Sequence, residues 1–384
     1  MKFRVDRDAL AESVAWAARS LPSRPSVPVL AGLMLKASSD GGSQALQLSG
    51  FDYETSARAG LPAEVADNGK VLVSGRLLAD ICRSLPAHQV EVTLEGQRAT
   101  LTCGSSRFTL QTMPVEDYPA LPAMPATSGT VPADTFAAAV AQAVSAAGRD
   151  DMLPLLTGVR IEISGEALTM LATDRFRASL VELAWSPGRP DAEAVALVPA
   201  RVLGETARSL AAGTELGVAL AGSGTGEQLI GFTAETGGSS RWTTTRLLDG
   251  EFPRVRQLFA AEATSTVWLE TAPFVESLRR VSLVAERNTP VRLTFETDQV
   301  LLEAGSGDEA QASESMPGHL AGEPLSIGFN PSYLLDGLGV VSAPWCHLAF
   351  TQPTRPVSIA GCAEEQGAPD LSFRYLLMPL RLQG

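Results

Sequence analysis

One module is repeated three times in this chain, and that repeat limits the fold more than any other feature of the sequence. Arg107 precedes Pro119 by twelve residues, as Arg241 precedes Pro253, and the C-terminal SFRYLLMPLRL repeats the opening of the same pattern. Corresponding landmarks are about 125 to 138 residues apart, which is the size of a small domain and far longer than a solenoid repeat. The sequence therefore predicts three similar domains that pack side by side with approximate rotational symmetry.

Composition allows several buried cores and excludes some partners. The 384 residues are 45% hydrophobic and carry a formal net charge of -13, which excludes a protein that coats nucleic acid with positive surface but not one whose few arginines gather on one face. No apolar run is long enough to cross a bilayer, and the N-terminus lacks the apolar core of a signal peptide, so a cytoplasmic protein is expected. Only three of the 30 basic residues are lysines, which suggests a GC-rich genome rather than a chemical role.

Each copy is expected to open with an amphipathic helix. The stretches that start at Asp8, Asp134 and Pro273 place apolar residues three and four apart, and Asp6 or Asp8 can cap the first helix. A second helix is predicted later in each copy, at about residues 77–85, 202–210 and 333–338. Alternating apolar runs between turn residues predict strands, including a hairpin around Gly96.

Two helices and roughly eight strands per copy indicate an α+β fold of three repeated domains with antiparallel sheets. Proline-rich segments punctuate the copies. The predicted domains are residues 1–127, 128–260 and 261–384.

A search for reactive chemistry finds no strong motif. The three histidines lie in different copies without a nucleophile motif nearby, and the glycine-rich run from Gly222 lacks the lysine of a phosphate loop, so a hairpin tip is the preferred interpretation. Adjacent acids such as Asp150 and Asp151 could bind Mg²⁺ or act as acid and base, but in polar stretches they are more often solvated. The four cysteines are widely spaced and are expected to be buried free thiols. No catalytic site, metal or cofactor is expected.

Several motifs, taken in chain order, resemble one family. They are MKFRVDRDALAESV at the N-terminus, SRPSVPVLAGLML after it, TDRFRAS from Thr173, LLDGEFP from Leu247, IGFNPSYLLDGL from Ile327 and LLMPLRL at the C-terminus. Together with the threefold repeat they resemble the beta subunit of bacterial DNA polymerase III, the sliding clamp, in its actinobacterial form. The resemblance runs from end to end, which makes it much more specific than any single motif.

The resemblance implies a DNA-clamp fold, in which two chains associate head to tail as a homodimer and their six domains close into a ring. It implies a processivity factor for DNA replication: duplex DNA passes through the ring without sequence preference, while the polymerase alpha subunit, the clamp loader and other proteins bind through a peptide motif. Because topology retains the ring, contacts with DNA should be weak and directed at phosphates. A threefold-repeat scaffold without a DNA role is the alternative from another class.

The resemblance also carries DNA-facing positions. These match or neighbour four arginines: Arg24, Arg76, Arg149 and Arg201. Each could equally be an ordinary arginine on a helix surface. The loop that follows Arg149 lacks an aromatic pair that some family members place near DNA, which puts a contact there in doubt.

A protein-binding pocket at the junction of the second and third copies is the second implied site. Its expected residues are Leu156, Thr173, Arg175, Arg177, Ala178, Pro253, Leu258, Asn330, Tyr333, Thr354, Pro356, Met378, Pro379, Leu380 and Arg381. An apolar groove with a polar rim can accept a short extended peptide with leucine and phenylalanine anchors. The alternative is that the apolar members only seal the domain junction.

Two positions depart from the family pattern. Ala178 stands where a leucine is common, which would weaken apolar contacts by roughly 1 to 3 kcal/mol for a fully buried side chain, and Asn288 stands where some members carry an aromatic. One interpretation is a specialised duplicate clamp whose pocket resists an antibiotic. Neutral drift in the shape of the pocket is the other.

Closure of the ring is expected between the first copy of one chain and the third copy of the other. Candidate residues are Arg107, Phe108 and Leu110 on one side and Leu283, Asp308 and Glu309 on the other. An unpaired edge strand invites association, and a sheet that continues across the junction would satisfy it. The alternative is a covered edge in a monomer.

Overall fold

The computed structural model describes residues 1–39, 45–220, 228–260, 262–286, 289–305, 310–352 and 354–382. The chain forms two compact units. The first contains Met1–Ala137, Trp185–Ala192 and Glu205–Leu247, and the second contains Ala138–Ala184, Glu193–Gly204 and Leu248–Gly384. Because the middle of the chain contributes to both units, they do not coincide with the three predicted copies, whose boundaries remain a prediction.

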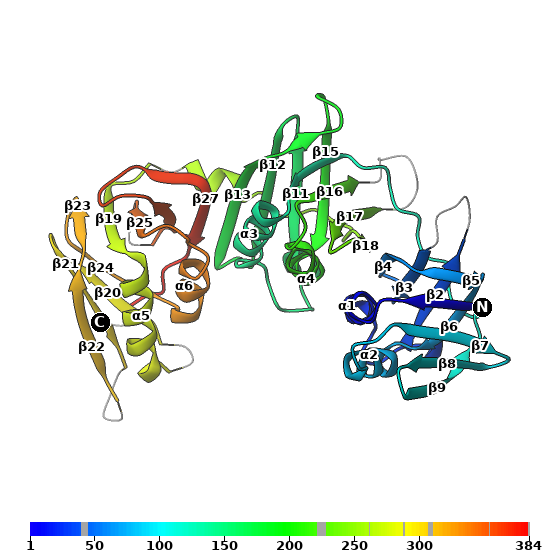
Figure 1. Cartoon of the computed structure of the whole chain (residues 1–384). Coiled ribbons are helices and arrows are strands. Elements are labelled where there is room, and N and C mark those ends of the chain that lie inside the picture. The colour runs from blue at the N-terminus through cyan, green and yellow to red at the C-terminus, as the bar shows by residue number, and fades with distance from the viewer. Residues whose placement is uncertain are drawn as a thin grey trace. The chain divides into compact units, whose positions relative to one another are not determined.

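Six α-helices occur in the described ranges, two for each repeat, as the periodicity predicts (Figure 1). They are α1 (Arg7–Ala17), α2 (Gly75–Ser84), α3 (Ala133–Val144), α4 (Ala200–Leu210), α5 (Thr271–Val281) and α6 (Pro331–Leu338). Asp6 caps α1, since its side chain accepts hydrogen bonds from the backbone of Asp8 and Ala9. The second helix of each copy begins two residues before its predicted start.

The first unit contains one sheet of fourteen strands. In spatial order they are β14 (Ser186–Pro187), β10 (Gly129–Pro132), β16 (Glu215–Leu220), β17 (Leu229–Thr236), β18 (Ser239–Arg246), β4 (Thr55–Pro62), β3 (Ala45–Phe51), β2 (Gly32–Ser38), β6 (Gly69–Ser74), β9 (Ser106–Met113), β8 (Arg98–Cys103), β7 (Val90–Glu95), β1 (Lys2–Val5) and β5 (Glu64–Asp67). The expected hairpin joins β7 to β8, with Gly96 in the left-handed region at a φ of 56°. Helix α1 packs against α2 and against β3 and β4.

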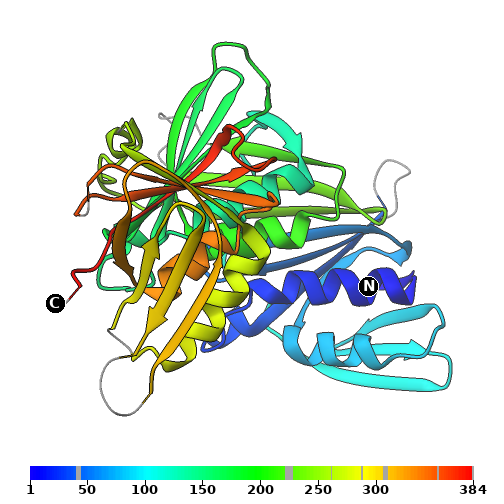
Figure 2. The same cartoon turned by 90° about the vertical axis from the view of Figure 1, so that its left-hand side faces the viewer.

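The second unit contains two sheets. Nine strands run in the order β15 (Glu193–Pro199), β11 (Gly158–Ser164), β12 (Ala167–Thr173), β13 (Arg177–Ala184), β27 (Pro369–Leu377), β26 (Val357–Cys362), β25 (Trp345–Phe350), β19 (Ser265–Glu270) and β23 (His319–Ala321). Four more run in the order β22 (Ala312–Pro317), β21 (Gln299–Ala304), β20 (Val291–Phe295) and β24 (Leu325–Phe329). Helix α5 packs beside α6 and against β21 and β22, as Figure 2 shows in yellow and orange.

Both large sheets continue from one copy of the repeat into the next. In the first unit β4 pairs with β18, so that Arg58 lies opposite Trp242. In the second unit β13 pairs with β27, so that Ala178 lies opposite Leu376. Every pairing between named strands is antiparallel in the described part of the chain, as predicted.

Aromatic side chains fill the cores. In the first unit Phe136 and Phe232 are fully buried, with ring centroids 5.7 Å apart, and in the second unit Phe295 packs against Phe350 at 5.3 Å. All four cysteines are buried free thiols, as expected. None of the helices in the described ranges is long and apolar enough to cross a membrane.

Candidate functional site: a buried arginine beneath exposed apolar side chains

The turn between β12 and β13 is held rigid by its own side chains. The Asp174 carboxylate accepts hydrogen bonds from the backbone of Phe176 at 3.0 Å and of Arg177 at 3.1 Å. The Thr173 hydroxyl donates to the Arg177 carbonyl at 2.7 Å and accepts from the Arg175 amide at 3.1 Å. Arg175 takes a left-handed conformation with a φ of 80°, which is uncommon for a residue with a side chain. These bonds fix the turn in one shape, and Phe176 is left 51% exposed at its tip.

The side chain of Arg177 links this turn to α6 and β27 through hydrogen bonds and ion pairs. Its side chain is only 2% exposed; Nε donates to Asp174 at 2.9 Å and Nη1 donates to Asp336 at 2.7 Å. The guanidinium also lies 4.4 Å from the centre of the Tyr333 ring, in cation–π geometry, and 3.4 Å from the Tyr375 hydroxyl. The Tyr375 hydroxyl in turn donates to the Tyr333 carbonyl at 2.7 Å. Four side chains, from α6, β27 and the turn, therefore meet on one cation.

The charge states of this cluster suit a structural role. Burial alone would lower the pKa of the Arg177 guanidinium, but Tyr375, Asp336 and Asp174 together raise it above its ordinary value. Burial raises the pKa of Tyr375, although Arg177 opposes the shift. Arg177 therefore stays charged and Tyr375 stays protonated at all ordinary pH values, and neither can exchange a proton with a ligand.

Exposed apolar side chains gather around this cluster. Phe176 stacks on Tyr333 with ring centroids 6.2 Å apart, and its carbonyl accepts from the Met378 amide at 2.8 Å. The Leu380 amide donates to the Gly328 carbonyl at 2.8 Å, which holds the C-terminal segment against β24. Phe176, Met378 and Leu380 are all exposed. Large apolar side chains that stay in water this close together are typical of a surface that binds a partner.

The expected pocket residues fall into three groups by exposure. Leu156, Thr173, Arg177 and Ala178 are buried; Asn330, Tyr333, Pro356 and Pro379 are half-buried; and Arg175, Pro253, Leu258, Thr354, Met378, Leu380 and Arg381 are exposed. Asn330 has a further task, since its side chain caps α6. The cluster described above brings together Thr173, Arg175, Arg177 and Tyr333, with Met378 attached through the turn.

The sequence reasoning missed four contributors to this site: Asp174, Phe176, Asp336 and Tyr375. Asp174 and Phe176 stand inside the TDRFRAS motif. An aspartate whose side chain accepts a hydrogen bond from the backbone N–H two residues later is a usual turn signal. Asp336 and Tyr375 gave no local signal, because they reach Arg177 only through pairing of distant segments.

Ala178 is 3% exposed and belongs to a closed apolar cluster. Its buried neighbours there are Leu171, Leu180, Leu197, Phe252, Val255 and Leu376. Phe252 and Val255 come from the segment that follows β18 and covers this face of the sheet. Position 178 is therefore a buried packing position, not an exposed one. Asn288, the other departure, lies outside the described residues.

The same turn occurs in the first copy with different chemistry. Asp52 accepts from the backbone of Glu54 at 3.0 Å and of Thr55 at 2.6 Å, and Tyr53 has a φ of 77°. The Arg246 amide donates to the Glu54 carbonyl at 3.0 Å, as Met378 does to Phe176. Glu54 thus replaces the exposed phenylalanine, and Thr55 replaces the buried arginine. The repeat preserves the backbone of the turn, but among the described residues the first copy has neither the exposed phenylalanine nor the buried arginine of the second unit.

The four arginines expected to face DNA are all exposed. Arg76 lies in the first turn of α2 and donates to the Pro22 carbonyl at 3.2 Å, close in sequence to Arg24. Arg149 donates to Asp336 at 3.2 Å, to the same carboxylate oxygen that accepts from Arg177. Arg201 lies in the first turn of α4.

Strand β9, which carries the expected interface residues Arg107, Phe108 and Leu110, and strand β22 each have a bare edge in the described part of the chain. Strand β9 pairs with β8 along its length but reaches β6 only through Thr112 and Met113. Strand β22 pairs with β21 alone and ends its sheet. Phe108 and Arg107 are exposed on β9, whereas Leu110 is buried and packs inside the unit. Leu283 is 84% exposed; Asp308 and Glu309 lie outside the described residues.

Comparison with known proteins accounts for the whole chain. Residues 1–122, 130–254 and 256–381 match the family models of the DNA polymerase III beta subunit N-terminal, central and C-terminal domains. The chain belongs to the DNA polymerase III beta subunit family, the beta sliding clamps. This clamp is 56% identical to the beta sliding clamp of Streptomyces coelicolor over 100% of both chains, and 43% identical to the beta sliding clamp homolog GriR of Streptomyces muensis over 99% of both. Its function is therefore that of a DNA polymerase processivity factor in replication.

A solved clamp has the same fold. The structure of the Pseudomonas aeruginosa sliding clamp bound to griselimycin superimposes with a TM-score of 0.87 at 25% identity, with 100% of both chains covered. The expected α+β fold of three clamp domains is confirmed, as is the resemblance to actinobacterial members.

Proposed function

We propose that two copies of this chain close head to tail into a ring around duplex DNA, and that the Arg177 site of each copy binds a short peptide from a replication protein. The three domains would be residues 1–127, 128–260 and 261–384. The observation that carries the ring is the presence of two different bare strand edges, β9 and β22, on one chain. Two unlike edges that each need a partner favour head-to-tail association.

The peptide assignment rests on the exposed side chains of Phe176, Met378, Leu380 and Leu258 above a rigid base. Arg177 holds Tyr333 and the turn in place, so the surface is preorganised and a peptide need not order it on binding. Leucine and phenylalanine anchors would replace water on these side chains. The polymerase alpha subunit and the clamp loader are the partners that we assign to it.

The DNA assignment rests on the exposure of Arg24, Arg76, Arg149 and Arg201 in a chain whose net charge is -13. Acidic outer surface repels phosphates, and a few arginines that face the duplex hold it weakly. We assign the chain to the cytoplasm and no catalytic step to it. Burial raises the pKa of Cys82 and of Cys346 to about 12, which disfavours a thiolate nucleophile at either position.

Retention on DNA tests the ring. Labelled protein is loaded with its clamp loader onto a nicked circular plasmid, and the DNA is isolated by gel filtration before and after one restriction cut. A closed ring stays on the circle in high salt and slides off the linear form. Equal retention on both forms would show binding by ordinary contacts and would refute the ring.

A specialised clamp with an antibiotic-resistant pocket is the second candidate, and Ala178 is the observation that favours it. The higher identity to the Streptomyces coelicolor clamp than to GriR supports the main replicative role instead. Griselimycin and a Gln-Leu-x-Leu-Phe peptide would be titrated into the wild type and Ala178→Leu. A resistant pocket binds the peptide but not griselimycin until leucine is restored, and unchanged affinities would remove the reason for the idea.

A further inference from the structure

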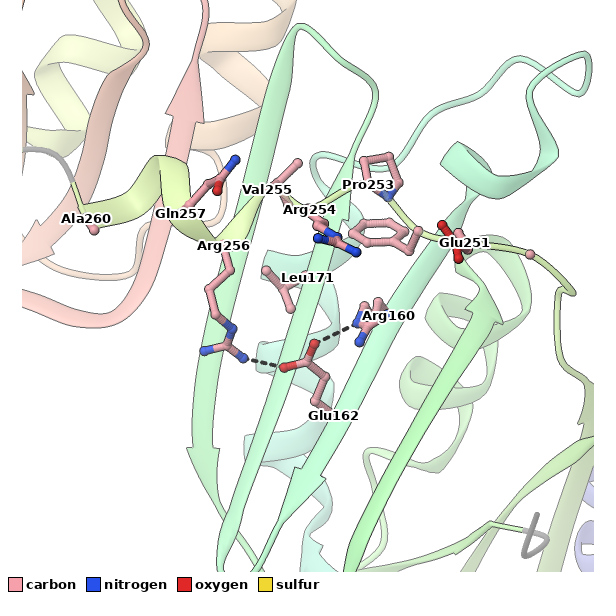
Figure 3. A pocket seen from close by; sticks show the side chains of 12 residues that line it. Arg160, Glu162, Leu171, Glu251, Pro253, Arg254, Val255, Arg256, Gln257 and Ala260 are labelled. Carbon is pink, nitrogen blue, oxygen red and sulfur yellow. Dashed lines mark hydrogen bonds and ion pairs between the residues drawn. The ribbon is translucent and has the colours of Figure 1, made fainter. Parts of the chain in front are cut away.

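One cavity of the second unit shares a single residue, Pro253, with the residues expected for the peptide site. Its volume is about 750 Å³, which is within the usual range for a ligand-binding pocket. The cavity lies between β11 and β12 and the segment 250–260 that runs over them (Figure 3). Leu171, Phe252 and Val255 give it an apolar lining, and these three belong to the same buried cluster as Ala178. One buried apolar cluster therefore contains both Ala178, an expected residue of the peptide site, and part of the lining of this cavity.

Three arginines and two glutamates supply the charge of the cavity. Figure 3 shows Glu162 between Arg160 and Arg256: Arg160 Nε donates to one carboxylate oxygen at 2.6 Å and Arg256 Nη2 to the other at 2.5 Å. Burial alone would raise the pKa of Glu162, but these hydrogen bonds lower it below its ordinary value. Glu162 is thus ionised and already saturated by two cations.

Two of the three arginines keep hydrogen-bond donors without an acceptor among the described residues. Arg254 makes no hydrogen bond or ion pair with any residue in the described ranges, and Arg160 uses only its Nε, which leaves both of its Nη groups without a described partner. Arg256 is further engaged, since Nη1 lies 3.6 Å from Glu182, which also pairs with Arg374 at 3.3 Å. The cavity therefore combines an apolar lining with the guanidinium of Arg254 and the two Nη groups of Arg160, none of which has a partner among the described residues. This combination suits a carboxylate on a partly apolar ligand, because the guanidinium fork matches carboxylate geometry.

We propose that this cavity binds carboxylate side chains from an acidic segment that adjoins the apolar clamp-binding motif of a protein partner. The proposal rests on the proposed function of the peptide site. An acidic peptide fits better than DNA, because the apolar lining of Leu171, Phe252 and Val255 can accept the aliphatic carbons of peptide side chains beside the carboxylates. The shared Pro253 makes the cavity reachable from a peptide that already occupies the neighbouring site.

Matched peptides test the proposal. A Gln-Leu-x-Leu-Phe peptide is extended by two aspartates at either end, and the control peptides carry two asparagines there. Fluorescence anisotropy is measured on the full-length protein, on Arg254→Gln, and on Arg189→Gln, which removes an exposed arginine elsewhere. One aspartate extension should bind about threefold to tenfold more tightly than its asparagine control. That gain should disappear in Arg254→Gln and in 0.5 M salt, but not in Arg189→Gln.

Other results would overturn the proposal. Equal affinity of aspartate and asparagine peptides, or the same loss in both arginine variants, refutes a carboxylate site. A twenty-nucleotide single strand that binds the wild type but not Arg254→Gln would assign the cavity to nucleic acid instead. A motif-free aspartate peptide is also titrated while the Arg254 Nε–H NMR signal is followed. If the motif-free peptide shifts that signal and no motif peptide binds, the carboxylate site is supported and the peptide-site assignment is refuted. If no peptide of either kind binds, both proposals are refuted.

Discussion

Asp336 joins the two predicted functional surfaces of the second unit, and neutralising it is the sharpest test of the Arg177 cluster. One carboxylate oxygen accepts from Arg177 at 2.7 Å and from Arg149 at 3.2 Å. In Asp336→Asn the amide oxygen can still accept hydrogen bonds, but the charge is lost. Arg177 then keeps only Asp174 as an anionic partner in its buried position.

The two contacts of Asp336 contribute unequally. The Arg177 side chain is 2% exposed, so loss of its charged partner should cost about 1 to 3 kcal/mol. The Arg149 side chain is 80% exposed, and such pairs contribute at most about 1 kcal/mol. Since the Asp336 side chain is itself one-third exposed, we expect a total loss of about 1 to 3 kcal/mol, nearly all of it through Arg177.

Native-state hydrogen exchange measures this loss locally, because it resolves the opening of α6 and β13 from unfolding elsewhere in a large chain. Asp80→Asn is the matched control: Asp80 pairs with Arg83 on α2, and their side chains are 70% and 73% exposed. The control should change the opening free energy of its own helix by less than about 0.5 kcal/mol. If Asp336→Asn costs α6 no more than that, the Arg177 cluster does not hold this site together. A loss of equal size in Arg149→Gln would also contradict the reasoning.

Three further outcomes are expected. Phe108→Asp on the bare edge of β9 should convert the dimer to monomer in analytical ultracentrifugation, while Leu371→Asp, an equally polar change at an exposed position on β27, should leave it dimeric. Hydrogen bonds from Arg280 and Ser277 lower the pKa of Glu314 to about 2 from its ordinary 4.5, so the contribution of Glu314 to stability is present above pH 4.5 and is lost as the pH falls toward 2. The difference in urea midpoint between wild type and Glu314→Gln should therefore shrink between pH 4.5 and 2, and a difference that stays constant with pH would refute this prediction. Arg201→Gln should speed diffusion of the loaded protein along DNA at low salt and leave its retention on circles unchanged, and slower diffusion would contradict a phosphate contact.

Local patterns in the sequence predicted the helices well, because each helix buries one apolar face that recurs every three to four residues. The cap at Asp6 and the hairpin at Gly96 were equally local. Leu110 shows where such patterns stop: it lies two residues from Phe108 on a strand of regular register, so both are on one face, but Leu110 is buried and Phe108 is exposed. Exposure on β9 depends on what covers it, which lies elsewhere in the chain.

The candidate site was predictable as a set of family positions but not as a mechanism. TDRFRAS and LLMPLRL located its two halves, yet the role of Arg177 depends on Asp336 and Tyr375, which lie 159 and 198 residues away. No local pattern marks an aspartate in a short helix as the partner of a distant arginine. The repeat could have indicated that the first copy lacks the site, because Glu54 and Thr55 stand where Phe176 and Arg177 do.

In the proposed ring, the two bare edges also decide how a defective chain behaves in a mixture. A chain with Phe108→Asp has lost β9 as a docking edge but keeps an intact β22, so it can still capture the β9 edge of a normal chain. The resulting pair is joined at one junction and open at the other. Such a variant should therefore inhibit replication dominantly in a cell that also makes the normal protein, and the inhibition should grow with the fraction of chains that carry the substitution. A variant in which both edges are blocked should not inhibit replication, because it cannot bind a normal chain.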